Sequence, residues 1–333
     1  MKTSDFARCL TAFFESYLPG IRNLSENTIK SYRDALRLLL VFCRDVCKIS
    51  PERLDFKKLD DELVIQFLNW LESERGCSVS TRNQRLVAIH AFFRFASVQE
   101  PENMCLCQRI LQIPYKKYTQ PIIQHLSPEQ TRALLATPDP AKKSGRRDRV
   151  LLSVLYDTGS RVQELCDLRV RDTRLDQPSV ITVTGKGGKT RFVPITNNTT
   201  ELLGSYMMEN RLDRRTCPDA PLFTNQKGAK LTRGGVSHIL SKHAAASLDE
   251  TQKKITPHVL RHSKSMHLYQ AGINLVYIRD FLGHVDISTT DVYARADTEM
   301  KRKQLENAYP DITPEPLMDW RHDEDLLSFL NSF

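Results

Sequence analysis

The segment VLLSVLYDTGSRVQEL, residues 150–165, contains the pattern from which the organisation of the chain can be worked out. Its first seven residues are nearly all apolar, which predicts a buried helix. A turn and a second helix follow, so Arg161 lies at a junction between a turn and a helix. Glu164 comes three residues later on the same predicted helix. By themselves these residues also fit a surface arginine and its neighbour.

A strand pattern follows this segment. Residues 180–184 alternate apolar and polar side chains, and residues 191–195 form a second short run. The connection GKGGKT, residues 185–190, is rich in turn-forming glycine and predicts a hairpin with lysines at its tip, among them Lys186. The remaining patterns are helical, so the predicted fold class is mainly α with a small antiparallel sheet.

Two further clusters carry chemically useful side chains. The stretch PHVLRH, residues 257–262, predicts a helix on which His258 and Arg261 are three residues apart and share one face. The second cluster contains Leu-Gly-His, which ends at His284, and then Tyr293.

Residues 1–107 have the pattern of a small helical bundle. Ser25 and Ser80 are suitable N-caps for the second and fourth helices. Residues 108–125 contain prolines and lysines without a clear period, which indicates an extended basic linker. A second domain opens at SPEQ, residues 127–130, where a serine cap precedes proline at the first helical position. The four helical segments of the bundle lie near residues 6–17, 25–42, 60–71 and 80–93.

The charge is unevenly distributed along the 333 residues, a length typical of two domains. The formal net charge of +8 divides into +2 for residues 1–110, +11 for residues 111–310 and −5 for residues 311–333. A basic middle region favours a polyanionic partner.

Composition excludes several other classes of protein. The chain is 40% hydrophobic and 26% charged, which is typical of a globular protein and not of a disordered one. It has no apolar run long enough to cross a bilayer, and residues 1–10 lack the apolar core of a signal peptide. We therefore expect a cytoplasmic protein with no membrane partner. The eight cysteines are expected to be reduced thiols; metal binding or pairing by Cys43 with Cys47, or Cys105 with Cys107, is the alternative.

The motifs together resemble the tyrosine recombinase, or phage integrase, family, most closely its short Xer-like and mobile-element members. The resemblance covers nearly the whole chain. The family has an arginine, a hairpin lysine, a His-x-x-Arg motif, a histidine in Leu-Gly-His and a tyrosine nine residues later. In this chain those positions are Arg161, Lys186, His258, Arg261, His284 and Tyr293.

The resemblance implies a domain layout for a bacterial, cytoplasmic enzyme. Residues 1–107 would be a SAM-like four-helix core-binding domain, residues 108–125 a linker, residues 126–310 the catalytic domain and residues 311–333 an acidic tail or helix. No arm-binding domain is expected before the first helix, which favours a recombinase acting on simple sites.

Cleavage of DNA by this family builds negative charge on the non-bridging phosphate oxygens. Arg161 and Arg261 each offer several fixed donors for those oxygens, which lysine cannot do in the same geometry. His284 adds a hydrogen bond to the same phosphate. The energy of the DNA linkage stays in a covalent bond to the enzyme, so no nucleotide cofactor is needed, and no metal is expected.

The remaining residues of the pattern move protons. Tyr293 is the expected nucleophile and forms a phosphotyrosine. Its phenol ordinarily has a pKa near ~10, so it needs a base, for which His258 is the candidate. Lys186 is the candidate acid for the leaving 5′ hydroxyl. Glu164 occupies a position where the family carries an acidic residue that supports the active site.

Three points stay open at this stage. Lys189 or Arg191 could replace Lys186 as the acid. His262 lies off the face shared by His258 and Arg261 and is expected to be structural. After His262 the family usually has threonine and an aromatic residue, whereas this chain has Ser263 and Lys264, so Lys264 either contacts phosphate or faces solvent.

We therefore expect a site-specific DNA recombinase that acts through a 3′-phosphotyrosine and a Holliday junction. Detection of its covalent adduct with DNA would test this expectation most directly. Four protomers, monomeric before they meet DNA, would assemble on paired duplex sites, with or without an accessory or partner recombinase. Integration or excision of a mobile element is the favoured role; resolution of chromosome or plasmid dimers, a type IB topoisomerase and a catalytically silent DNA-binding protein are the alternatives. The expected DNA contacts are Lys30, Arg33, Arg82, Arg85, Lys116 and Lys117.

Overall fold

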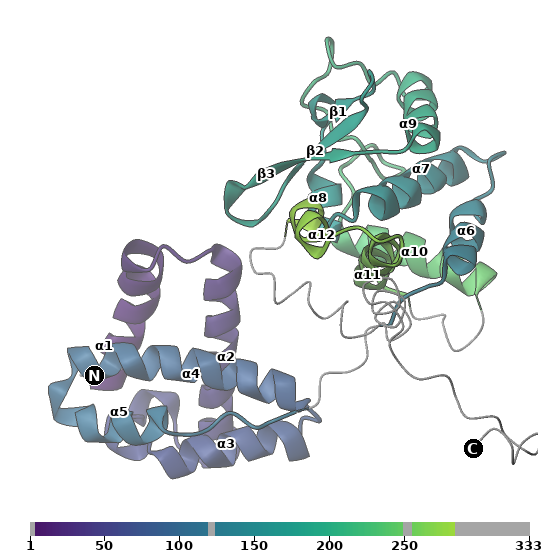
Figure 1. The fold of residues 1–333 in the computed structure, drawn as a ribbon. Helices are drawn as coiled ribbons and strands as arrows, with labels where there is room; N and C mark the ends of the chain where they lie inside the picture. Colours follow the sequence, from purple (N-terminus) through teal and green to yellow (C-terminus); the bar gives the residue numbers. More distant parts are fainter. Residues whose placement is uncertain (1–3, 119–123, 249–254, 284–333) are drawn as a thin grey trace, which may run out of the picture. The chain divides into compact units, whose positions relative to one another are not determined.

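The computed structural model describes residues 4–118, 124–248 and 255–283, except for the side chain of Lys186. The chain divides into two compact units, Met1–Pro121 and Ile122–Phe333. Each unit has its own hydrophobic core. Most of the described residues are helical, as Figure 1 shows, and one small sheet lies in the second unit.

The N-terminal unit is a helical bundle around an aromatic core. The rings of Phe6, Phe13 and Phe56 all lie within 6.4 Å of the ring of Phe92, measured between centroids. Phe6 and Phe13 meet Phe92 edge-to-face, whereas Phe56 is stacked on it, and such ring pairs add to the stabilisation that burial supplies. The helices are α1 (Asp5–Ala12), α2 (Glu26–Asp45), α3 (Asp61–Ser73), α4 (Val79–Gln99) and α5 (Met104–Leu111), and α1 continues into a wider π-helical turn over Phe13–Ile21.

Serine side chains start two of these helices. Ser25 caps α2, as expected, and its hydroxyl accepts the N–H of Thr28. The expectation of Ser80 as the cap of α4 was wrong, because Ser78 accepts the N–H of Thr81 and the helix begins at once after it. Ser80 therefore lies within the first turn of α4.

Helix α5 occupies part of the stretch that was expected to be a linker. It ends at Leu111, and Ile110 and Ile113 are buried in the core of the N-terminal unit. The helix is only eight residues long, so packing against α3 and α4 must supply most of its stability. Packed structure in this unit therefore continues beyond residue 107.

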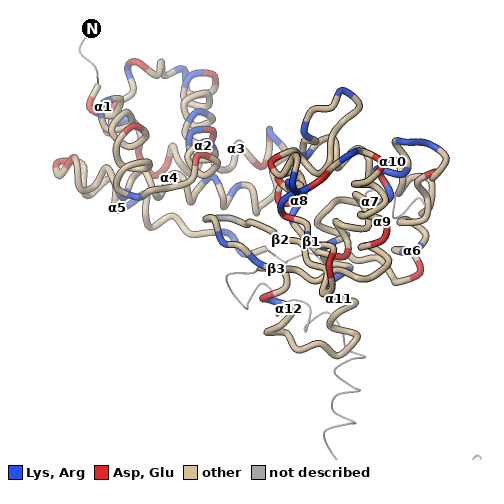
Figure 2. Tube along the Cα trace, turned by 90° about the horizontal axis from the view of Figure 1, so that it is seen from above, with Lys and Arg blue, Asp and Glu red and all other residues tan. Residues whose placement is uncertain are grey.

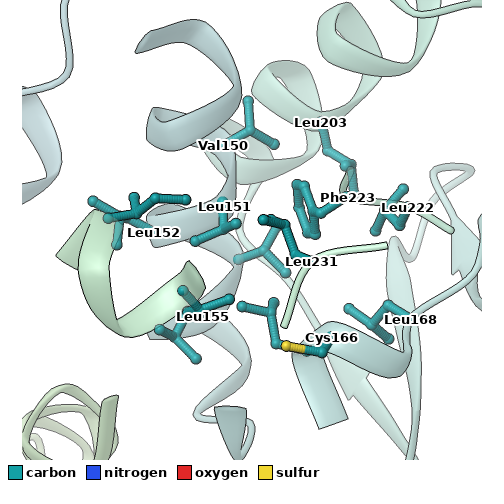
Figure 3. Packing of buried hydrophobic residues seen from close by; sticks show 14 of the residues in the cluster. Val150, Leu151, Leu152, Leu155, Cys166, Leu168, Leu203, Leu222, Phe223 and Leu231 are labelled. Carbon is teal, nitrogen blue, oxygen red and sulfur yellow. The ribbon is translucent and has the colours of Figure 1, made fainter. Parts of the chain in front are cut away.

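The second unit is built around helix α7, whose apolar side chains are buried on several sides. Figure 3 shows Leu151, Leu152 and Leu155 among side chains from other elements, including Leu203 and Phe223. Helix α6 starts with the expected serine cap at Ser127 and proline at the first helical position, and Gln130 completes a capping box with Ser127. The helices are α6 (Pro128–Ala136), α7 (Lys143–Thr158), α8 (Val162–Asp167), α9 (Asn197–Glu209), α10 (Arg233–Ser247), α11 (Pro257–Gln270) and α12 (Leu275–Leu282).

The sheet contains three antiparallel strands in the order β1–β2–β3. The expected hairpin is confirmed, with Val180 opposite Pro194 and Thr184 opposite Thr190. Ile181, Val183 and Val193 point into the core. Strand β1 was not expected, because two residues carry no recognisable alternation. The strands are β1 (Thr173–Arg174), β2 (Val180–Thr184) and β3 (Thr190–Pro194).

Two general features complete the fold. Among residues 4–118, 124–248 and 255–283, no helix combines the length and the apolar character needed to cross a membrane. All eight cysteines are free thiols, and burial raises the pKa of Cys9 and of Cys43 to about 12. These two thiols are therefore protonated at neutral pH.

Replacing Ile110 with alanine should lower the free energy of unfolding of the N-terminal unit by about 2–5 kcal/mol, because it leaves a cavity under α5. The chain has two tryptophans, Trp70 in α3 and Trp320. In a Trp320→Phe background, the fluorescence of Trp70 during urea unfolding reports on this unit. Met104→Ala, at an exposed position of the same helix, is the control. Equal, small effects of the two changes would show that α5 does not contribute to the core.

Candidate active site

Arg161 is held at the start of α8 by a carboxylate on the same helix. Its backbone N–H donates to Oε2 of Glu164 at 2.9 Å, and its Nη1 donates to Oε1 of Glu164 at 2.8 Å. The side chain of Glu164 is 5% exposed, whereas that of Arg161 is 38% exposed. These two bonds therefore hold the backbone of Arg161 and one side of its guanidinium, and part of the guanidinium stays accessible to a ligand.

Glu164 has a second cationic partner, Arg191 on β3. The Nη2 of Arg191 donates to Oε2 of Glu164 at 2.7 Å. Burial by itself raises the pKa of Glu164, but the hydrogen bonds from Arg191 and from Arg161 outweigh it, and the pKa is lower than usual. Glu164 is therefore ionised at neutral pH.

Arg191 also reaches helix α12. Its Nε donates to the carbonyl oxygen of Phe281 at 3.0 Å, and its side chain is only 12% exposed. A guanidinium held at both places does not suit the role of general acid, which the sequence had left open for Arg191. Lys189, in contrast, is exposed on the hairpin.

Arg261 joins the ends of two other helices. From the second turn of α11, its Nη1 donates to the carbonyl oxygen of Gly159 at 2.5 Å and its Nη2 to that of Leu282 at 2.8 Å. Gly159 closes α7 in the left-handed conformation, and a Cβ there would lie 2.9 Å from Leu282. Glycine at this position lets α12 approach closely enough for Arg261 to bridge both carbonyls.

His258 lies one turn before Arg261, on the exposed side of α11. Partial burial of the ring lowers its pKa, and the positive charges of Arg261 and Arg161 lower it further. His258 and Arg261 are one turn apart on α11, and Arg261 bonds the carbonyl of Gly159, two residues before Arg161, so the three residues lie in one region of the fold. His258 is therefore mainly neutral at pH 7 and able to accept a proton.

His262 is adjacent to His258, with 6.5 Å between the centroids of their rings. Burial is the main reason that the pKa of His262 falls to about 4, and the charges of His258, Arg261 and His125 act in the same direction. His262 is more enclosed than His258. This environment agrees with the structural role expected for it.

Lys264 does not behave as either expectation proposed. Its Nζ donates to Oδ1 of Asp157 at 3.0 Å, and it lies over the rings of Tyr156 and Phe281. Its side chain is largely buried. Asp157 also accepts the N–H of Thr196 at 2.7 Å. Lys264 therefore connects α11 to the end of α7 instead of facing solvent or a phosphate.

The three other expected site residues are Lys186, His284 and Tyr293. Lys186 begins a short turn at the hairpin tip, where Figure 2 shows a concentration of basic residues. His284 and Tyr293 lie outside the described residues, although Gly283, immediately before His284, closes α12 in the left-handed conformation. The described site thus unites Arg161, Glu164, His258 and Arg261.

The residues expected to contact DNA differ in exposure. Lys30, Arg33, Lys116 and Lys117 are exposed, and Arg85 is half-buried. Arg82 needs a correction, because its side chain is buried and its Nη1 donates to the carbonyl oxygen of Pro114 at 3.2 Å.

Asn83, beside Arg82, exchanges two hydrogen bonds with the backbone of Lys116. The start of α4 thus anchors residues 114–116, and Arg82 makes this structural contact and does not contact a phosphate.

In the part of the chain that the structure describes, no group of three or more His, Cys, Asp or Glu side chains is arranged to ligate a metal ion.

Residues 124–300 match the phage integrase family, and residues 11–100 match the N-terminal SAM-like domain of phage integrases. The chain belongs to the phage integrase family of tyrosine recombinases. A Sinorhizobium fredii protein named as an integrase/recombinase, y4rC, is 37% identical over 99% of both chains. The tyrosine recombinase XerD of Vibrio cholerae is 34% identical over 86% of this chain and 91% of its own. This chain is therefore a tyrosine site-specific recombinase by family.

Solved structures agree with the fold. The XerH recombinase, in a post-cleavage complex with palindromic difH substrate, is 25% identical and superimposes with a TM-score of 0.66 over 86% of this chain and 80% of its own. The Tn1549 transposon integrase, in complex with transposon right-end DNA, has a TM-score of 0.69 over 90% of this chain and 98% of its own, at 21% identity. The expected combination of a SAM-like domain and a recombinase catalytic domain is confirmed.

His262 should make the recombinase less stable as the pH falls from about 6.5 to about 4. In this range the unfolded chain binds a proton at His262 that the folded chain does not, so the free energy of unfolding decreases and then levels off below about 4. His262→Asn should flatten this decrease in urea titrations across the range. His258 acts in the same direction, so some slope should remain. His238→Asn, at an exposed position of α10, is the control, and an unchanged slope for His262→Asn would contradict the assignment.

Proposed function

We propose that this recombinase cuts and rejoins duplex DNA through a 3′-phosphotyrosine at Tyr293. The observation that carries the proposal is the convergence of Arg161, Arg261 and a neutral His258 around the ends of α7, α8 and α11. A phosphate placed beside Arg161 would meet the exposed part of its guanidinium next to a proton acceptor. Arg261 is buried, with its two terminal nitrogens on the carbonyls of Gly159 and Leu282, and adds positive charge behind this position. Such preorganised positive charge stabilises the additional charge of the transition state.

The proposed cleavage step transfers the DNA phosphate from its 5′ oxygen to Tyr293 and moves two protons. The Tyr293 oxygen attacks phosphorus while its proton passes to His258, and the bond between phosphorus and the 5′ oxygen breaks. Lys186 donates a proton to the leaving 5′ oxygen, and His284 donates a hydrogen bond to a non-bridging oxygen. Rejoining is the same sequence in reverse, with a 5′ hydroxyl of the partner strand as the nucleophile. Lys189 remains the alternative acid.

Binding would rest mainly on phosphate contacts from both domains. The exposed Lys30, Arg33, Lys116 and Lys117 and the half-buried Arg85 are the proposed contacts of the N-terminal unit and the segment that follows it. Affinity should therefore fall steeply with salt. Four protomers on two sites would exchange strands in pairs through a Holliday junction. We place this reaction in the cytoplasm of a bacterium.

The favoured biological role is integration or excision of a mobile element. Support comes from the y4rC protein, which is 37% identical over nearly the full length of both chains, against 34% for the XerD of Vibrio cholerae. Xer-like resolution of chromosome or plasmid dimers is the second candidate, favoured by the 34% identity to XerD. Recombination between sites from the ends of a mobile element, against recombination between sites near a replication terminus, separates the two.

Tyr293→Phe should abolish the covalent adduct and leave DNA binding unchanged, because it removes only the nucleophilic oxygen. The assay uses nicked suicide substrates from the DNA that flanks the gene, with the adduct detected by its sensitivity to protease. Tyr277→Phe, at an exposed position of α12, is the matched control and should form the adduct normally. An adduct with Tyr293→Phe would contradict the assignment of the nucleophile, and binding without any wild-type adduct would favour a catalytically silent DNA-binding protein.

Deleting residues 317–333 should weaken pairing of two DNA sites more than binding to one site. This segment combines acidic residues with the apolar Leu326, Leu327, Phe329 and Leu330, a pattern suited to docking on another protomer. Native gel shifts with one-site and two-site complexes measure both equilibria. Equal loss of both complexes, or loss of neither, would contradict a role of the tail in assembly.

A further inference from the structure

We propose that Arg191 is a positioning residue for the recombination reaction. It neutralises Glu164, so that Arg161 can direct its charge to the DNA phosphate. This inference rests on the proposed function. Arg191 comes from β3, five residues after Lys186, and contacts residues that are far from it in sequence. Its position in the chain alone does not reveal this contact.

One guanidinium connects three parts of the site. The Nη2 of Arg191 bonds Glu164, which holds the turn of Arg161, and its Nε bonds the carbonyl oxygen of Phe281, three residues before His284. The hairpin that carries Lys186 is thereby tied to α8 and to the end of α12. A planar guanidinium suits this task because its donors point in fixed directions.

Two glycines lie close to the ion pair of Arg191 and Glu164. A Cβ at Gly283 would lie 3.0 Å from Nη1 and 3.2 Å from Cδ of Arg191, and one at Gly185 would lie 3.1 Å from Oε1 of Glu164. Two glycines therefore allow the chain to pass closely on both sides of the ion pair. Close packing of this kind holds Glu164 and Arg191 in one geometry.

The charges explain why Glu164 needs two arginines. Glu164 is buried, and a buried carboxylate without adequate partners is costly. If Arg161 were its only cation, Arg161 would have to remain on Glu164. With Arg191 supplying one positive charge, the group of three has a net positive charge, and the exposed part of Arg161 can serve a phosphate.

The test compares Arg191→Gln with Arg191→Lys in single-turnover cleavage of the suicide substrate. Arg191→Gln should reduce the cleavage rate on the order of 100-fold, as expected for a small displacement of catalytic groups, with similar DNA affinity. Without Arg191 the pKa of Glu164 should rise, so the acidic limb of the pH–rate profile should move to higher pH. Arg191→Lys keeps the positive charge but lacks the planar set of guanidinium donors. It should therefore keep the pH–rate profile closer to that of the wild type than the cleavage rate.

Arg146→Gln is the matched control. Arg146 makes a similar two-bond contact with Glu209, at 3.0 and 2.6 Å, between α7 and α9. Its loss should leave both the rate and the pH profile unchanged. A wild-type rate and profile for Arg191→Gln would overturn the proposal, and so would equal losses in Arg191→Gln and Arg146→Gln.

Amide hydrogen exchange of the free protein tests the same contacts without requiring activity. Exchange should become faster in peptides that contain Arg161, the β2–β3 hairpin and residues 279–283 of Arg191→Gln, and the thermal midpoint should show whether the variant is folded. If Arg191→Gln does not fold, Arg191→Lys provides the same comparison. Unchanged exchange in these peptides would overturn the positioning role. Absence of a wild-type adduct would instead contradict the proposed function, and the two failures can therefore be told apart.

Discussion

The described site depends on one buried carboxylate, Glu164, and on the cations that neutralise it. A buried carboxylate must be paired and hydrogen-bonded, and Glu164 satisfies this requirement with the side chain and backbone of Arg161 and with Arg191. The same contacts therefore fix the direction in which Arg161 leaves its turn. The glycines at 185 and 283 follow from the same constraint, because any side chain there would press on the ion pair.

Helix α7 connects the hydrophobic core of the catalytic unit to the candidate active site. Its middle is buried among apolar side chains, so its position is set by packing (Figure 3). Its last turn then provides polar anchors: Asp157 pairs with Lys264, and the carbonyl of Gly159 accepts from Arg261. The final carbonyls of a helix have no partners within it, and cationic side chains are well suited to fill that role. Structural stability and placement of the active site are thus provided by the same helix end.

In the N-terminal unit, the buried Arg82 has a structural role in place of the expected contact with DNA. Arg82 belongs to a basic group that suggests contact with nucleic acid, yet it is buried and bonded to the carbonyl of Pro114. Together with Asn83 it holds residues 114–116 against α4, while Lys116 and Lys117 stay exposed. A positive charge in a sequence therefore identifies a DNA contact only when the fold leaves the side chain accessible.

Local patterns determined much of this protein. The capped start of α6, the β2–β3 hairpin, the apolar helix α7 and the placement of Arg161 at a helix start all follow from neighbouring residues, and their order indicated the family. Tertiary structure alone decided that Arg191 pairs with Glu164, that Lys264 pairs with Asp157, that Arg82 is buried and that α5 packs into the core. The physical reason is the range of each effect. Capping and periodicity act within a few residues, whereas burial and ion pairing depend on which distant segments the folded chain brings together.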